Sequence, residues 1–190
     1  TTKPAGVQAW SARELSEMVL PPIRHVVEGL LPMGMGVLVA KPKLGKSWMV
    51  LDLCLAVAQG EPFLGFPTRQ HGTLYLALED GKSRMQTRLR RLLEGRPAPA
   101  NMHVMFQAQR LGEYLDANPD IHLVCIDTLS KIKPKAKPFE NAYDADYDYM
   151  GRLKAFADSR GICVLLVHHT RKSKNPEDSF DNINGSTGIL

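Results

Sequence analysis

The chain has 190 residues, the length of one domain, and 44% of them are hydrophobic, which is enough for a core and excludes a fully disordered chain. Its 24 Lys and Arg against 20 Asp and Glu give a net charge of +4, a balance typical of an ordinary soluble protein. No apolar run reaches the roughly 18 residues of a membrane span, and the first residues lack the apolar stretch of a signal peptide. Cys54, Cys125 and Cys163 each lie within an apolar run, which predicts buried free thiols and a cytoplasmic protein.

Apolar runs and helix signals alternate along the chain after a mixed N-terminal stretch. Residues 1–29 predict an arm with one short helix near 11–18, because Ser11 and Glu14 have capping-box spacing. Compact apolar runs predict strands at 36–40, 73–78, 102–106, 121–126 and 162–167. Helices are predicted at 47–59, 82–94, 111–118 and 144–158.

Strands that are apolar throughout and alternate with helices predict an α/β fold in which helices cover both faces of a mainly parallel sheet. We expect this three-layer domain over residues 30–190, after the arm. The sequence ends on an apolar stretch, Gly188, Ile189 and Leu190, which resembles the start of another strand. We therefore expect the domain to be truncated at its C-terminus.

Between the first strand and the helix that follows it lies a near match to the phosphate-binding P-loop pattern of Gly, four residues, Gly, Lys and Ser or Thr. A loop that leads into a helix N-terminus directs backbone N–H groups and the positive end of the helix dipole at an anion. Gly45 allows the backbone to approach phosphate, Lys46 can neutralise the β- and γ-phosphates, and Ser47 can hold Mg²⁺. Ala40 replaces the first glycine of the pattern, which is acceptable unless φ is positive there.

Acidic residues follow two of the predicted strands. Asp127 comes directly after the strand at 121–126, where a P-loop enzyme needs a carboxylate beside Mg²⁺, and we favour this role over that of a turn-forming Asp. Glu79 ends the strand at 73–78 and is expected to be the base that polarises a water molecule for attack on the γ-phosphate. Asp80 competes for that role but also suits the N-cap of the next helix.

Two histidines, His168 and His169, follow the strand at 162–167. Alternation along a strand sends neighbouring side chains to opposite faces. One ring can therefore reach the γ-phosphate from an adjacent strand end, while the other is expected to form structural hydrogen bonds.

Five stretches of the sequence together resemble one family. They are residues 41–48 (KPKLGKSW), 60–65 (GEPFLG), 76–80 (LALED), 126–129 (IDTL) and 167–170 (VHHT). The group they resemble is the RepA-like, RecA-type ATPases known as AAA_25, and the likeness covers residues 30–190. It implies a RecA-like core, ATP with Mg²⁺, assembly into a homo-oligomeric ring or filament, and motor work on DNA of the helicase or replication type.

The resemblance also implies roles for individual residues. Lys46 and Ser47 bind phosphate and metal, Glu79 is the catalytic base, Asp127 is the Walker B acid that holds Mg²⁺ through water, and His169 rather than His168 senses the γ-phosphate. The arginine finger of the family would lie past Leu190. The implied nucleotide-binding segment consists of Lys41, Pro42, Lys43, Leu44, Gly45, Lys46, Ser47 and Trp48.

Lysines and arginines follow the strand ends at Asp127 and His169, in loops that resemble the channel-facing loops of RecA-like rings. Such side chains suit sequence-independent contact with the phosphates of single-stranded DNA, although solvated loops would have the same composition. The candidate DNA contacts are Lys131, Lys133, Lys135, Arg171 and Lys172. The basic helix at 82–94 is expected to present a solvated or interface face.

Two other functions stay open. One is a ParA-like partition ATPase, since Lys41 occupies the position of that group's signature lysine, although Pro42 and Lys43 stand where it has glycines. The other is a regulator that binds ATP but hydrolyses it poorly. A nucleotide kinase lacks a recognisable acceptor lid here, and a GTPase is disfavoured because the sequence has no Asn-Lys-x-Asp motif.

Overall fold

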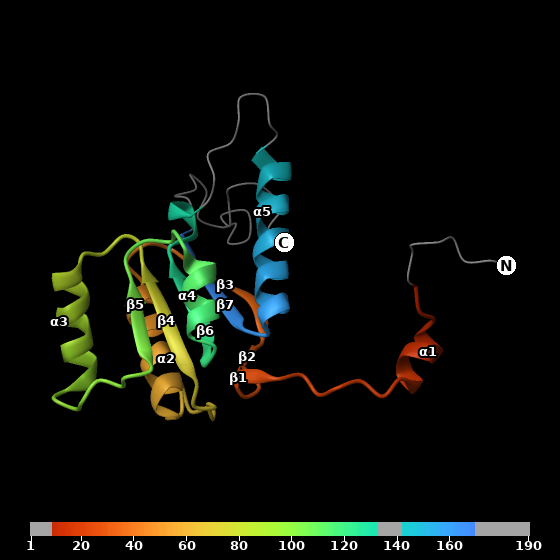
Figure 1. Cartoon of the computed structure of the whole chain (residues 1–190), viewed down its shortest axis with the longest axis horizontal. Coiled ribbons are helices and arrows are strands. Elements are labelled where there is room, and N and C mark those ends of the chain that lie inside the picture. The colour runs from red at the N-terminus through yellow and green to blue at the C-terminus, as the bar shows by residue number, and fades with distance from the viewer. Residues whose placement is uncertain (1–8, 133–141, 170–190) are drawn as a thin grey trace.

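The structure, a computed structural model, describes residues 9–132 and 142–169. The elements are α1 (Ala12–Glu17), β1 (His25–Val27), β2 (Leu31–Pro32), β3 (Gly34–Ala40), α2 (Lys46–Gln59), β4 (Gly72–Ala77), α3 (Lys82–Leu93), β5 (Met102–Met105), α4 (Leu111–Ala117), β6 (Ile121–Asp127), the 3-10 helix η1 (Leu129–Lys131), α5 (Ala142–Arg160) and β7 (Cys163–His169). Figure 1 shows their arrangement.

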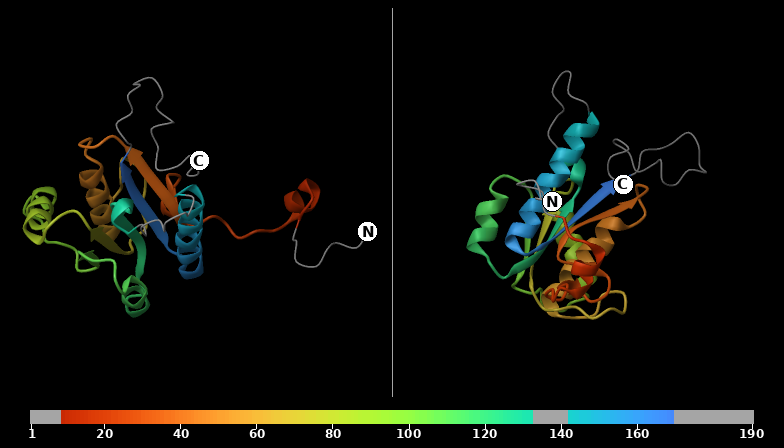
Figure 2. Two further views of the ribbon diagram at one scale, coloured as in Figure 1. Left: turned by 90° about the horizontal axis from the view of Figure 1, so that it is seen from above. Right: turned by 90° about the vertical axis from the view of Figure 1, so that its right-hand side faces the viewer.

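Five parallel strands in the order β3-β7-β6-β4-β5 form the central sheet. Helices α2 and α3 lie on one face, and α4 and α5 lie on the other, so the domain has three layers (Figures 1 and 2). The predicted α/β fold with a parallel sheet is confirmed. Because all five strands run the same way, their carboxyl ends meet at one edge, and this edge receives the loops that carry most of the candidate site residues.

Alternate residues of each central strand pack against opposite layers, as the period of a strand requires. In β4, Tyr75 belongs to the cluster that includes α2, whereas Leu74 and Leu76 belong to the cluster that includes α4 and α5. Both faces of β4 and β6 are thus covered, which explains why these segments appear in the sequence as continuous apolar runs. The three cysteines are buried free thiols, as predicted, and burial raises the pKa of Cys163 to about 12.

Strands β1 and β2 form a small antiparallel pair that the sequence did not predict. Val26 and Val27 are fully buried in the α2-side core, and the backbone N–H of Glu28 donates to the carbonyl of Pro67 at 2.9 Å. These residues lie within the segment that was expected to be an arm. We propose that the domain begins before His25 rather than at residue 30.

Helix α1 lies apart from the rest of the chain in Figures 1 and 2, and none of its residues is buried. The predicted capping box at its start is present. The Ser11 side chain accepts from the backbone N–H of Glu14, and the Glu14 carboxylate accepts from the backbone N–H of Ser11. Within the described part of the chain, no helix has both the length and the hydropathy needed to cross a bilayer.

Candidate functional site: a cavity at the carboxyl edge of the sheet

A cavity of about 370 Å³ lies at the carboxyl edge of the sheet. Its walls come from the loop between β3 and α2, from the first turn of α2, from α3, and from the ends of β4, β6 and β7. The lining residues are Lys43, Gly45, Lys46, Ser47, Trp48, Ala77, Glu79, Asp80, Arg84, Arg88, Asp127 and His169. The structure therefore brings together candidate residues that span more than 120 positions of the sequence.

The loop at 41–45 connects β3 to α2 with two residues in left-handed backbone conformations, Lys43 (φ 66°) and Gly45 (φ 84°). Gly45 is also the N-cap of α2. Ala40, which replaces the first glycine of the P-loop pattern, is the last residue of β3 and does not have a positive φ. The substitution therefore introduces no backbone strain.

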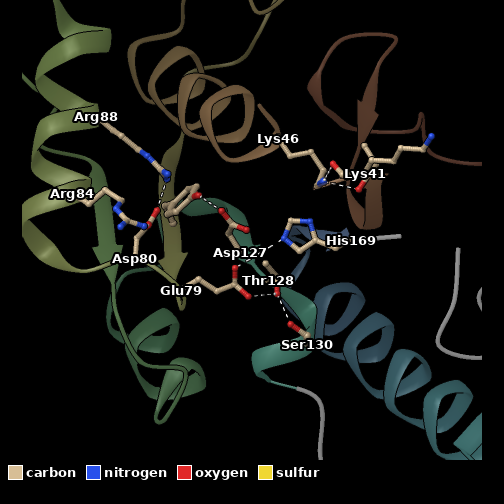
Figure 3. Close-up of polar contacts among 12 residues, drawn as sticks. Lys41, Lys46, Glu79, Asp80, Arg84, Arg88, Asp127, Thr128, Ser130 and His169 are labelled. Atoms are coloured by element: carbon tan, nitrogen blue, oxygen red, sulfur yellow. Dashed lines mark hydrogen bonds and ion pairs between the residues drawn. The ribbon is translucent and has the colours of Figure 1, made fainter. Parts of the chain in front are cut away.

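Lys46 is the first residue of α2 and is only 6% exposed. Its Nζ donates to the carbonyl oxygens of Ala40 at 2.6 Å and Lys41 at 2.8 Å (Figure 3). Burial lowers the pKa of Lys46, and the nearby Asp127 carboxylate partly opposes this shift. The ammonium group thus faces both loop carbonyls and an acidic side chain.

Asp127 ends β6 and is buried. The Tyr75 hydroxyl donates to its Oδ2 at 2.6 Å. Burial, and then the charge of Asp127, raises the pKa of Tyr75 far above the ordinary tyrosine value, so this hydroxyl stays protonated and remains a donor. Ser47 lines the same cavity. A hydroxyl and a carboxylate are oxygen ligands of the kind that Mg²⁺ prefers beside nucleotide phosphates, so the residues present fit that ion.

Glu79 follows β4, and its side chain is 43% exposed. Its Oε1 accepts from the Thr128 hydroxyl at 3.3 Å, while its Oε2 lies 4.0 Å from Nε2 of His169. His169 ends β7 opposite Ala40 of β3, and its ring faces the cavity beside Glu79 (Figure 3). Its buried Nδ1 has no hydrogen-bond partner among residues 9–132 and 142–169.

Asp80 has a different environment, since its side chain is only 10% exposed. One oxygen accepts from Arg84 at 3.0 Å, and the other forms an ion pair with Arg88. The Cζ atom of Arg88 also lies 5.5 Å from the centre of the Trp48 ring, and that of Arg91 lies 5.6 Å from it. Trp48 is half-buried beside these arginines at the cavity wall.

The sequence analysis did not identify Arg84 and Arg88 as site residues. Their face of α3, which was expected to be solvated or to form an interface, also borders the cavity, although the Arg84 side chain is still 69% exposed. A signal was available, because Asp80, Arg84 and Arg88 are each four residues apart, the spacing at which side chains meet along a helix. No residue spacing in the sequence pointed to Thr128 as a residue of the site.

Other predicted residues lie away from the cavity or outside the described part of the chain. Lys41, Pro42 and Leu44 are exposed and do not line the cavity, although the carbonyl of Lys41 contacts Lys46. Lys131 is exposed in η1. The remaining candidate DNA contacts, Lys133, Lys135, Arg171 and Lys172, lie outside the described residues, as does the expected strand at the C-terminus.

The family model AAA_25, described as an AAA domain, matches residues 1–175. No curated protein matches the chain.

Proposed function

The chain belongs to the AAA_25 family of AAA domains, an assignment that makes it a P-loop ATPase domain that binds nucleotide, and from this premise we propose that it binds ATP with Mg²⁺ and hydrolyses ATP as the motor domain of a RecA-like DNA helicase or replication ATPase. One observation carries the proposal. Five residues line a single cavity: Lys46 and Ser47 of α2, Asp127 of β6, His169 of β7, and Glu79, which follows β4.

Binding of the triphosphate would use the positive charge that surrounds this cavity. The N-terminus of α2, a helix of 14 residues, directs free backbone N–H groups toward it. Lys46 would exchange its two carbonyl partners for phosphate oxygens, to which a cation is more strongly attracted. Arg84 and Arg88 add positive charge on the opposite wall, where Asp80 holds them in place.

Hydrolysis requires a base near the water molecule that attacks the γ-phosphate. Glu79 suits this role because its carboxylate is partly exposed to the cavity. It would accept the proton of the water as the new P–O bond forms in line with the bond to ADP, which breaks. Mg²⁺, held by Ser47 and near Asp127, would supply charge stabilisation at the β- and γ-phosphates when bound.

His169 lies beside Glu79 and can donate a hydrogen bond to a γ-phosphate oxygen, which would make it the sensor of hydrolysis. A neighbouring subunit would supply an arginine finger, which implies a ring or filament. Contact with single-stranded DNA would involve residues that follow β6 and β7 in the sequence, among them the exposed Lys131 of η1.

The test is ATP binding and turnover, each measured with and without single-stranded DNA. We expect Lys46→Ala to lower ATP affinity at least about tenfold and to abolish turnover, because a charge-assisted contact to phosphate is lost. Lys82→Ala is the matched control, since it removes the same charge from an exposed residue that does not line the cavity. Turnover that survives Lys46→Ala would contradict the proposed site. Tight binding without turnover, even with DNA, would instead favour the regulator that binds ATP but hydrolyses it poorly.

A further inference from the structure

Three oxygen-bearing side chains form a line from the cavity to η1. Thr128 follows β6 directly and is 1% exposed. Its Oγ1 lies 3.3 Å from Oε1 of Glu79 and 2.6 Å from Oγ of Ser130 (Figure 3). Ser130 belongs to η1 and is exposed. The line therefore joins a buried hydroxyl at the sheet edge to a turn at the surface.

The direction of these hydrogen bonds follows from a count of hydrogens. A carboxylate can only accept, so Thr128 donates its single hydroxyl hydrogen to Glu79. Thr128 then has none left for Ser130, and Ser130 must donate to Thr128. Each bond in such a chain polarises the next. The order Ser130 to Thr128 to Glu79 is thus set by chemistry.

We propose that Thr128 is a positioning residue for Glu79, and that Ser130 in turn orients the Thr128 hydroxyl. The inference rests on the proposed function in one respect, the role of Glu79 as the base. The distance of 3.3 Å between Oγ1 of Thr128 and Oε1 of Glu79 is longer than the usual O–H···O distance of about 2.7–2.8 Å. The bond therefore orients the carboxylate but holds it weakly. Oε2, which is 4.0 Å from His169, is left to accept from the attacking water.

Because of this arrangement, a substitution at Thr128 or Ser130 can affect the chemical step without affecting nucleotide binding. Neither Thr128 nor Ser130 lines the cavity, so neither is expected to contact the nucleotide. A base must lie within hydrogen-bond reach of its water, and a displacement of about 1 Å can slow a reaction by up to roughly a hundredfold. Loss of the Thr128 hydroxyl should therefore lower kcat while KM and nucleotide affinity stay the same.

The experiment compares Thr128→Val, which has a similar shape but no hydroxyl, with Thr128→Ser, which keeps the hydroxyl. For Thr128→Val we expect kcat to fall about tenfold, with KM and ATP affinity within about twofold of wild type. Thr128→Ser should restore kcat to within about threefold of wild type. Ser130→Ala should lower kcat less than Thr128→Val, because Thr128 can still donate to Glu79.

Several results would overturn the inference. An unchanged kcat in Thr128→Val would show that the hydroxyl does not position the base. Equal losses in Thr128→Val and Thr128→Ser, or a rise in KM without a fall in kcat, would assign Thr128 a packing role alone. Thermal melting of each variant, followed by circular dichroism, checks that the kinetics come from folded protein.

A second measurement keeps the inference testable if wild-type protein binds ATP but does not hydrolyse it, an outcome that would contradict the proposed function. The chain is labelled with ¹³C at glutamate carboxyl carbons, and the Glu79 signal is assigned by its disappearance in Glu79→Gln. We expect Thr128→Val to move this signal and Thr128→Ser to leave it nearly in place. A Glu79 signal that is the same in Thr128→Val and wild type would overturn the positioning role whether or not ATP turns over.

Discussion

Glu79 and Asp80 are consecutive in the sequence and line the same cavity, yet their environments differ sharply. The Asp80 side chain is 10% exposed, and each of its oxygens is paired with an arginine of α3. The Glu79 side chain is 43% exposed, and one of its oxygens accepts a long hydrogen bond from Thr128. One wall of the cavity is therefore held by ion pairs, while the other carries a carboxylate with unused hydrogen-bonding capacity.

This contrast bears on which of the two acids can serve as a base. Both oxygens of Asp80 already accept charge-assisted hydrogen bonds from guanidinium groups, which leaves them less able to accept a further hydrogen bond from the attacking water. Among residues 9–132 and 142–169, no arginine pairs with Glu79. The comparison supports Glu79 as the catalytic base and Asp80 as the residue that holds Arg84 and Arg88 against the cavity.

The largest expected effect concerns Glu79, the more exposed of the two acids. We expect Glu79→Gln to lower kcat at least roughly a hundredfold, because the amide cannot accept the proton. Nucleotide affinity should stay within about threefold, since Gln keeps the size and polarity of Glu. Single-turnover hydrolysis and equilibrium ATP binding measure the two quantities. An unchanged rate would mean that another residue is the base, and that the difference between Glu79 and Asp80 has no role in catalysis.

A smaller effect is expected at the wall held by ion pairs. Arg88→Gln should weaken ATP binding about tenfold, because it removes one cation from the cavity. Arg91→Gln is the matched control, since Arg91 lies at almost the same distance from Trp48 but does not line the cavity. Titration with a fluorescent ATP analogue measures both variants. Equal losses in the two variants would mean that the net charge of α3, rather than the position of Arg88, determines affinity.

The smallest expected effect concerns Asp80 itself. Asp80→Asn should leave kcat within about threefold of wild type, because in our proposal Asp80 takes no proton. It should lower the free energy of unfolding by about 1–2 kcal/mol, since Arg88 loses its ion-pair partner in a mostly buried position. Urea denaturation measures the second quantity. A loss of turnover comparable to that of Glu79→Gln would reverse the assignment of the two acids.

The fold was accessible from the sequence because both faces of the central strands are covered. Complete coverage makes segments such as 74–77 and 123–126 continuously apolar, a pattern that stands out without knowledge of the tertiary structure. Strand β1 was not predicted, because it has only 3 residues and its burial depends on α2 and on the segment near Pro67. Short strands carry too few residues to show a period.

The grouping of the candidate site residues was also predictable in part. A parallel sheet brings its carboxyl ends to one edge, so Glu79, Asp127 and His169 could be expected there before their side chains were seen. The contact between Thr128 and Glu79 could not be predicted in this way. It requires β6 to lie beside β4, and it also requires particular side-chain rotamers, which no residue spacing encodes. The catalytic and DNA-binding roles of individual residues remain predictions.

The two carbonyl partners of Lys46 have a consequence for nucleotide affinity. Its ammonium group bridges the carbonyls of Ala40 and Lys41, so a phosphate must outcompete main-chain acceptors that the loop itself supplies. Pro42, which follows these carbonyls, restricts the backbone through its fixed φ. Phosphate and the two carbonyl oxygens therefore compete for the Lys46 ammonium group. Substitutions that change only the stiffness of the loop should then change the affinity for phosphate.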